Sequence, residues 1–231
     1  MFSRGKTAKV GFGVLALADT LLAGSDRNAA RRLRYVTKPL LMPALTTAFT
    51  PVTHDRHDGL RQGTVVAQAF SWSGDVALLG QGERAFLAGV GSFLAAHVAY
   101  ISGFLTARDR HSDPSPLRGT GSRAAAATWL VGAPLMSLAA GRKDARFRVP
   151  IAVYATALAS MFAASTMLDR QLPKEARGKV IAGTSLFLLS DSILGAREFL
   201  LEGDSRVLNS AVMATYTAGQ WLIADGVAAT R

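Results

Sequence analysis

The feature that most constrains this chain is a set of long apolar runs without charged side chains. Residues 85–107, 124–141 and 149–168 contain no Asp, Glu, Lys or Arg. At a helical rise of about 1.5 Å per residue, each run is long enough to cross a hydrocarbon layer of about 30 Å. The sequence therefore predicts an integral membrane protein.

Eight apolar segments follow one another along the 231 residues, joined by short connections rich in Gly, Pro, Asp and Arg. The segments are residues 10–24, 35–52, 64–82, 85–107, 124–141, 149–168, 180–196 and 207–224. Connections this short leave no linker between domains. We expect residues 1–231 to form a single transmembrane domain, an all-α, polytopic bundle of eight helices.

The basic residues predict where the protein resides and what it contacts. The net charge is +10, and the Lys and Arg residues gather in the connections between apolar segments. That placement suits anionic lipid head groups, and no basic stripe interleaved with aromatic residues indicates a nucleic-acid interface. Lys and Arg are slightly more numerous on the face that carries both termini, which predicts a multi-pass protein of the cell membrane with cytoplasmic termini.

Several classes of site are disfavoured by the residue types present. The chain has no cysteine, so disulfides, thiolate nucleophiles and cysteine-bound metals are excluded. Gly11-Phe12-Gly13 follows no strand and is not a dinucleotide loop, and no Gly-x-Ser-x-Gly elbow is present. Residues 54–58 contain His and Asp, but this segment is better explained as a solvated loop. We expect neither a cofactor nor a bound metal.

Ionisable and polar side chains inside the apolar segments are the strongest functional signal. Near the bilayer centre a charged side chain costs at least about 2.5 kcal/mol, so such residues usually face the bundle interior and mark a functional path. They are Asp19, Lys38, Asp75, His97, Tyr100, Asp191, Tyr216 and Gln220.

Because odd and even helices run in opposite directions, these positions converge in the half of the bundle away from the termini. Counted at about 1.5 Å per residue, Lys38 lies about 6 Å and Asp75 about 10 Å from the face opposite the termini. The sequence therefore predicts one polar pocket that opens towards this face.

The polar set admits three interpretations. Asp19 and Lys38 would form an ion pair, and Tyr216 and Gln220 hydrogen bonds between helices, if their role were packing alone. Two carboxylates in a low-dielectric pocket favour hydrolase chemistry, with one acting as acid and the other as base. The same carboxylates would serve as a proton relay in a transporter or lipid translocator. A metal-dependent hydrolase with His97 as a ligand is disfavoured, because this is a lone intramembrane histidine.

Two fragments of the chain resemble each other. Residues 73–80 read Ser-Gly-Asp-Val-Ala-Leu-Leu-Gly, and residues 190–195 read Ser-Asp-Ser-Ile-Leu-Gly. They lie four helices apart, so the likeness suggests duplication of a four-helix unit.

Five short motifs in order along the chain resemble the YhhN family, the lysoplasmalogenase family of eight-helix membrane proteins. They are Thr37-Lys38-Pro39, Ser73-Gly74-Asp75, residues 91–100, Ser190-Asp191-Ser192 and Ala214-Thr215-Tyr216. The resemblance implies hydrolysis of the vinyl ether bond of a lysoplasmalogen, giving a fatty aldehyde and a glycerophospho-base. Residues 54–58 and 112–123 match no pattern of the family.

The resemblance also assigns roles to residues. Asp75 and Asp191 match the family's intramembrane aspartates, and we interpret them, with His97, as catalytic. The expected partners are a lysophospholipid substrate and membrane lipids, with Lys38 meeting the lipid phosphate. The substrate-binding candidates are Lys38, Tyr100, Asp19, Ser190, Tyr216 and Gln220.

Overall fold

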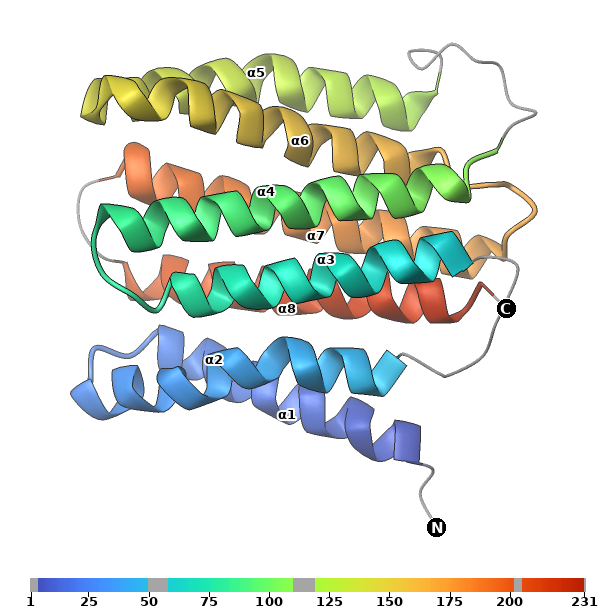
Figure 1. The fold of residues 1–231 in the computed structure, drawn as a ribbon, viewed down its shortest axis with the longest axis horizontal. Helices are drawn as coiled ribbons and strands as arrows, with labels where there is room; N and C mark the ends of the chain where they lie inside the picture. Colours follow the sequence, from blue (N-terminus) through green and yellow to red (C-terminus); the bar gives the residue numbers. More distant parts are fainter. Residues whose placement is uncertain (1–3, 50–57, 110–118, 202–204, 231) are drawn as a thin grey trace.

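The computed structural model describes residues 4–49, 58–109, 119–201 and 205–230, and the chain forms eight α-helices there (Figure 1). They are α1 (Arg4–Ala23), α2 (Asn28–Phe49), α3 (Asp58–Ala77), α4 (Glu83–Thr106), α5 (Thr120–Lys143), α6 (Arg148–Thr166), α7 (Lys174–Phe199) and α8 (Arg206–Ala228). A 3-10 turn, η1 (Ala145–Phe147), precedes α6. The predicted all-α bundle of eight helices is confirmed.

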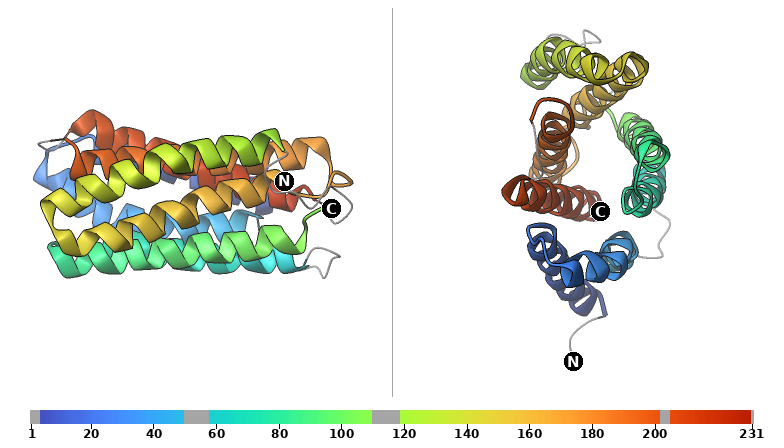
Figure 2. Two further views of the ribbon diagram at one scale, coloured as in Figure 1. Left: turned by 90° about the horizontal axis from the view of Figure 1, so that it is seen from above. Right: turned by 90° about the vertical axis from the view of Figure 1, so that its left-hand side faces the viewer.

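The helices pack as four consecutive hairpins. Hairpins α3–α4 and α7–α8 form the centre, and α1–α2 and α5–α6 lie on opposite sides of it (Figure 2). α8 packs on α1, and α4 packs on α6. The start of α1 and the end of α8 lie at the same end of the bundle (Figure 1). Every helix runs antiparallel to the next, and because there are eight helices in the described chain, the first and the last begin and end on the same side.

Glycine pairs let the helices of both central hairpins touch backbone to backbone. A Cβ added to Gly63 of α3 would lie 2.6 Å from the Cα of Gly103 in α4. In the other hairpin, a Cβ on Gly183 would lie 2.7 Å from the carbonyl oxygen of Gly219. Such close approach supplies the dispersion contacts that hold helices together in lipid. No larger residue fits at these crossings without separating the helices.

Two helix boundaries differ from the prediction and alter the depth of the polar residues. α3 runs from Asp58 to Ala77 rather than over 64–82, because the apolar residues after Ala77 form the turn that leads to Gly82, whose φ is 84°. α2 begins at Asn28, seven residues before the apolar run, since its arginines are compatible with a helix. At about 1.5 Å per residue, Asp75 lies about 3 Å from its helix end and Lys38 about 15 Å from the start of its own. Counted from the ends of their own helices, the two residues therefore lie in the reverse of the expected order.

Four helical segments of the described chain are long and apolar enough to cross a membrane. They are α4, α5, α7 and the segment formed by η1 and α6. α1, α2, α3 and α8 have 20 to 23 residues each, which is also sufficient length. Their polar and charged residues lower the mean hydropathy, so hydropathy alone divides the bundle into two groups of helices.

Candidate active site

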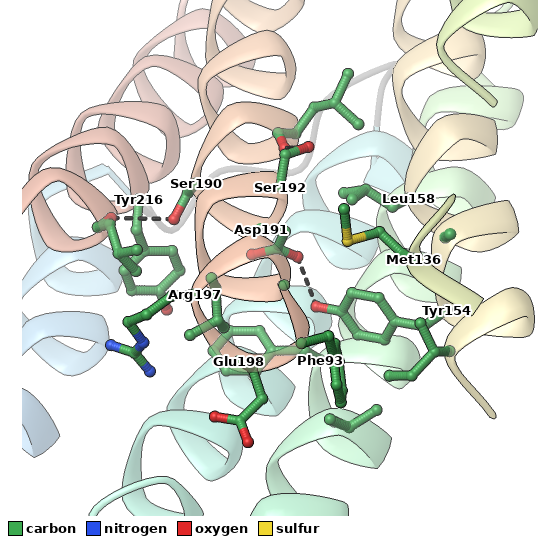
Figure 3. Close-up of a pocket in the computed structure, with 18 of the residues that line it drawn as sticks. Phe93, Met136, Tyr154, Leu158, Ser190, Asp191, Ser192, Arg197, Glu198 and Tyr216 are labelled. Carbon is green, nitrogen blue, oxygen red and sulfur yellow. Dashed lines mark hydrogen bonds between the residues drawn. The ribbon is translucent and has the colours of Figure 1, made fainter. Parts of the chain in front are cut away.

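A cavity of about 630 Å³ lies among α2 to α8, in the half of the bundle away from the termini (Figure 3). Its volume is typical of small-molecule sites, which measure about 300–1,000 Å³. Apolar side chains, including Phe93, Trp129 and Leu158, form much of its wall. Asp75 and Asp191 both line it. The structure thus brings together the two carboxylates of the third and seventh apolar segments.

Asp75 is paired with a buried cation. Its Oδ1 lies 3.3 Å from Nζ of Lys38, and its Oδ2 accepts a hydrogen bond of 2.8 Å from the hydroxyl of Tyr216. Asp75 is 1% exposed and Lys38 is 7% exposed. An ammonium and a hydroxyl on separate oxygens stabilise the ionised carboxylate. Helices α2, α3 and α8 therefore meet at this group.

Asp191 has uncharged neighbours. Its Oδ2 accepts a hydrogen bond of 2.5 Å from the hydroxyl of Tyr154 in α6 (Figure 3). The Nε2 of His97 lies 3.5 Å from the same oxygen, outside hydrogen-bonding geometry, and neither His97 nitrogen has a hydrogen-bond partner within the described residues. The His97 ring packs edge-on against Tyr154 and Phe187. Among the described side chains, no Lys or Arg forms an ion pair with Asp191.

The partners of the two aspartates occupy corresponding places in the two halves of the chain. Each aspartate lies on the first helix of a central hairpin. The preceding helix supplies one neighbour, Lys38 from α2 and Tyr154 from α6. The second helix of the opposite hairpin supplies the other, Tyr216 from α8 and His97 from α4. This arrangement is what a duplicated four-helix unit would produce.

The sequence profile of the YhhN family matches residues 33–227. The chain belongs to the YhhN family. The match covers α3 to α7, nearly all of α8 and most of α2, and so includes both aspartates and their four neighbours. No curated protein and no solved structure matches the chain.

Tyr100 and Gln220 of this YhhN protein lie behind the cavity wall. The Tyr100 hydroxyl donates a hydrogen bond of 2.5 Å to Oε1 of Gln220, and the Gln220 amide donates one of 3.0 Å to the Ser71 hydroxyl. All three side chains are buried and tie α4, α8 and α3 together. Neither Tyr100 nor Gln220 is among the residues that line the cavity.

Asp19 and Lys38 do not form the ion pair considered from the sequence. Asp19 accepts hydrogen bonds from Nε and Nη2 of Arg34, at 3.3 and 3.2 Å, and one of 2.6 Å from the Thr37 hydroxyl. Lys38 is a helical turn further along α2 and faces Asp75 instead. The Asp19–Lys38 interpretation is therefore wrong, because Arg34 takes the place of Lys38. Asp19 is fully buried and does not line the cavity, whereas Arg34 does.

Ser190 and Tyr216 line the cavity, as does Lys38. The Ser190 hydroxyl is already engaged, since it donates a hydrogen bond of 3.0 Å to the Val212 carbonyl (Figure 3). His97 reaches the cavity only through Asp191 and is not part of its lining.

Sequence reasoning missed Tyr154, Arg34 and Arg197, which all line the cavity. Tyr154 lies within an uncharged run, so it could have been found as the other polar residues inside the apolar segments were, from the cost of placing a polar side chain in lipid. The two arginines lie directly beside the apolar runs 35–52 and 180–196, where basic residues are typical of loops. Only the longer helices of the structure place them beside the cavity.

The described residues contain no group of three or more His, Cys, Asp or Glu side chains that could hold a metal ion. Residues 54–57 and 112–118, which belong to the segments that match no pattern of the family, lie outside the described part of the chain. The end of the second loop, Thr120–Arg123, forms the first turn of α5.

Proposed function

We propose that this YhhN protein is a multi-pass membrane hydrolase that cleaves the vinyl ether bond of a lysoplasmalogen. The products are a fatty aldehyde and a glycerophospho-base. The observation that supports this proposal is that two carboxylates with different neighbours, whose side chains are 2% and 8% exposed, line one largely apolar cavity. An apolar wall suits a lipid chain, and carboxylate pairs act on acetal-like centres in glycoside hydrolysis.

Cleavage of a vinyl ether begins with a proton added to the alkene carbon that does not carry oxygen. The other alkene carbon then becomes an oxocarbenium ion. We assign Asp191 as the proton donor, because it has no ion-pair partner among the described residues and a buried carboxyl group without a cation is least costly in its neutral form. Its hydrogen bond from Tyr154 fixes the orientation of the carboxyl group.

Asp75 performs the complementary role. Its carboxylate, held by Lys38 and Tyr216, offsets the positive charge of the oxocarbenium ion and takes a proton from the attacking water. The water oxygen bonds to the cationic carbon and gives a hemiacetal. In the collapse, Asp75 returns its proton to the glycerol oxygen as the carbon–oxygen bond breaks, and Asp191 takes the hemiacetal hydroxyl proton. One water is consumed, and both carboxyl groups regain their starting state.

Aldehyde release tests this function. Purified protein in detergent is incubated with a lysoplasmalogen, and the aldehyde is measured for the wild type and for Asp75→Asn and Asp191→Asn. Asp144→Asn, in the exposed turn before η1, is the matched control. We expect activity in the wild type and the control and its loss in the two cavity variants. Absence of aldehyde from the wild type, or unchanged activity in both cavity variants, would falsify the proposal.

A transporter that uses the same carboxylates as a proton relay is less well supported. Transporter sites are typically built where membrane helices are interrupted. Asp75 and Asp191 both lie within uninterrupted helices. Proteoliposomes that move a lipid without consuming it would favour the transporter over the hydrolase.

A further inference from the structure

The outer part of the cavity carries a second group of polar side chains, separate from the aspartates. Arg34, Lys143, Arg197, Glu198 and Asn209 line the cavity near the end of the bundle opposite the termini. We call these five residues the mouth cluster. They come from α2, α5, α7 and α8 and comprise three cations, one carboxylate and one amide. The mouth is thus positively charged but retains a single acid.

The three cations of the mouth cluster are not equally engaged. Arg34 is bound to the buried Asp19, and Lys143 lies 2.5 Å from Oε1 of Glu198. Arg197 donates to the amide oxygen of Asn209 and has no carboxylate partner among the described residues. A guanidinium held by a neutral amide keeps its full charge and further donors for a planar or tetrahedral anion. Arg197 is therefore the best anion-binding group of the cavity.

The position of Arg197 relative to Asp191 fits a glycerophospholipid. Both residues lie on α7, six positions apart, which is about 9 Å along the axis at about 1.5 Å per residue. A glycerol unit that joins an ether oxygen to a phosphate suits such a separation. Glu198 lies seven residues after Asp191, two helical turns along the same face of α7.

We propose that the mouth cluster binds the zwitterionic head group of a lysophospholipid, with the phosphate on Arg197 and the head-group ammonium on Glu198. The proposal rests on the proposed function, because it places the ether bond of the same lipid beside Asp191. It assigns the phosphate to Arg197 rather than to Lys38, which is buried and paired with Asp75.

The ion pair between Lys143 and Glu198 does not prevent this role. Its side chains are 53% and 33% exposed, and an exposed ion pair contributes little to stability. The lipid ammonium takes the place of the Lys143 ammonium beside Glu198, and Lys143 becomes free to contact the phosphate. The zwitterionic head group is neutral overall, so binding pairs the charges of the mouth without changing their sum.

Binding of lipids that cannot be cleaved tests the mouth cluster separately from catalysis. The probes are a saturated 1-alkyl lysophosphatidylcholine, the matching 1-alkyl glycerophosphate without choline, and the matching 1-alkylglycerol without phosphate. Dissociation constants are measured in detergent for the wild type, Arg197→Gln, Arg197→Lys and Glu198→Gln. Arg146→Gln is the control, because Arg146 lies on the exposed turn at the same end and pairs with Asp144 and Glu83.

We expect Arg197→Gln to weaken binding of both phosphate-bearing lipids about tenfold, as lost charge-assisted hydrogen bonds do, and to leave 1-alkylglycerol binding unchanged. Arg197→Lys should recover part of the loss. Glu198→Gln should weaken only the choline lipid. Equal losses in Arg197→Gln and Arg146→Gln, or a wild type that binds all three lipids equally, would overturn the proposal.

The outcomes separate this inference from the proposed function. A wild type that releases aldehyde but does not discriminate among the three probes overturns the mouth cluster alone. A wild type that discriminates among the probes but releases no aldehyde overturns the hydrolase alone. Unchanged 1-alkylglycerol binding shows that a variant has folded with its cavity intact. If Arg197→Gln does not fold, the affinities of Arg197→Lys and of the wild type for the three probes decide whether the mouth cluster binds the head group.

Discussion

Asp75 and Asp191 occupy matching places on the first helices of the two central hairpins, yet only Asp75 has a cation beside it. The preceding helix places Lys38 at the first carboxylate and Tyr154 at the second. One site is therefore an ion pair, and the other is a hydrogen-bonded carboxyl group among neutral rings. Similar helices can thus present chemically different acids to one cavity, and the residue of the preceding helix, Lys38 or Tyr154, determines which acid has a cation beside it.

Replacing each aspartate by asparagine should have the largest effect on activity, and the two variants should differ in thermal stability. Each change removes an acid–base group, so we expect aldehyde release to fall about 100- to 10,000-fold. Asp75→Asn also leaves the buried Lys38 without its counter-ion, at a cost of about 3–5 kcal/mol. Asp191→Asn keeps an acceptor for Tyr154 and should unfold near the wild-type temperature. Equal thermal shifts in detergent for the two variants would contradict the assigned difference.

Removing both members of the ion pair should restore stability without activity. Lys38→Met alone leaves a buried, unpaired carboxylate, whereas Lys38→Met combined with Asp75→Asn leaves no buried charge at this site. We expect the double variant to be more stable than either single variant by about 1–4 kcal/mol, because breaking a buried pair costs more than replacing it. A double-mutant cycle of thermal unfolding measures this coupling. Additive losses would show that Lys38 and Asp75 do not interact in the folded protein.

Removing either of the two tyrosine hydroxyls should lower the unfolding free energy by a smaller amount, and by a different amount for each. Tyr216→Phe removes a hydrogen bond to a charged carboxylate, for which a loss of about 1.5–3 kcal/mol is typical. Tyr154→Phe removes one to the carboxyl group that we assign as neutral, typically about 0.5–1.5 kcal/mol. Unfolding free energies of the two variants check the order. The reverse order would place the charged carboxylate on α7 instead of α3.

His97→Gln should have the smallest effect. His97 is not part of the cavity lining, and its nitrogens have no hydrogen-bond partner among the described residues. We expect aldehyde release within about fivefold of the wild type, which corresponds to about 1 kcal/mol. The measurement is the rate per folded protein. A loss as large as that of Asp191→Asn would establish His97 as a catalytic group acting through Asp191.

The helices could be predicted from the sequence because apolar runs of membrane-spanning length report directly on the environment of each segment. Convergence of Asp75 and Asp191 followed from the alternating direction of the helices. The depth of Lys38 did not, because α2 begins seven residues before its apolar run. Hydropathy marks the part of a helix that contacts lipid, and hydrogen bonding of the backbone sets where the helix ends.

The partners of the polar residues could not be predicted either. Asp19 binds Arg34, whereas Lys38, one turn along the same helix, binds Asp75. The choice depends on how α2 is rotated about its axis and which neighbour each of its faces meets. Sequence position gives the rotation of residues relative to one another on a helix, but not the identity of the helix opposite.

The backbone contacts at Gly63–Gly103 and Gly183–Gly219 determine which parts of the bundle can move when a lipid enters. Helices in contact along their backbones resist sliding and separation, so each aspartate travels with its own hairpin as a stiff unit. No glycine of the described residues brings the backbone of the outer hairpin α5–α6 against that of α7, and this hairpin carries Tyr154. A lateral opening that moves α6 away from α7 would therefore break the hydrogen bond between the Tyr154 hydroxyl and Asp191. Whether this hydrogen bond is formed indicates whether α6 and α7 are closed against each other.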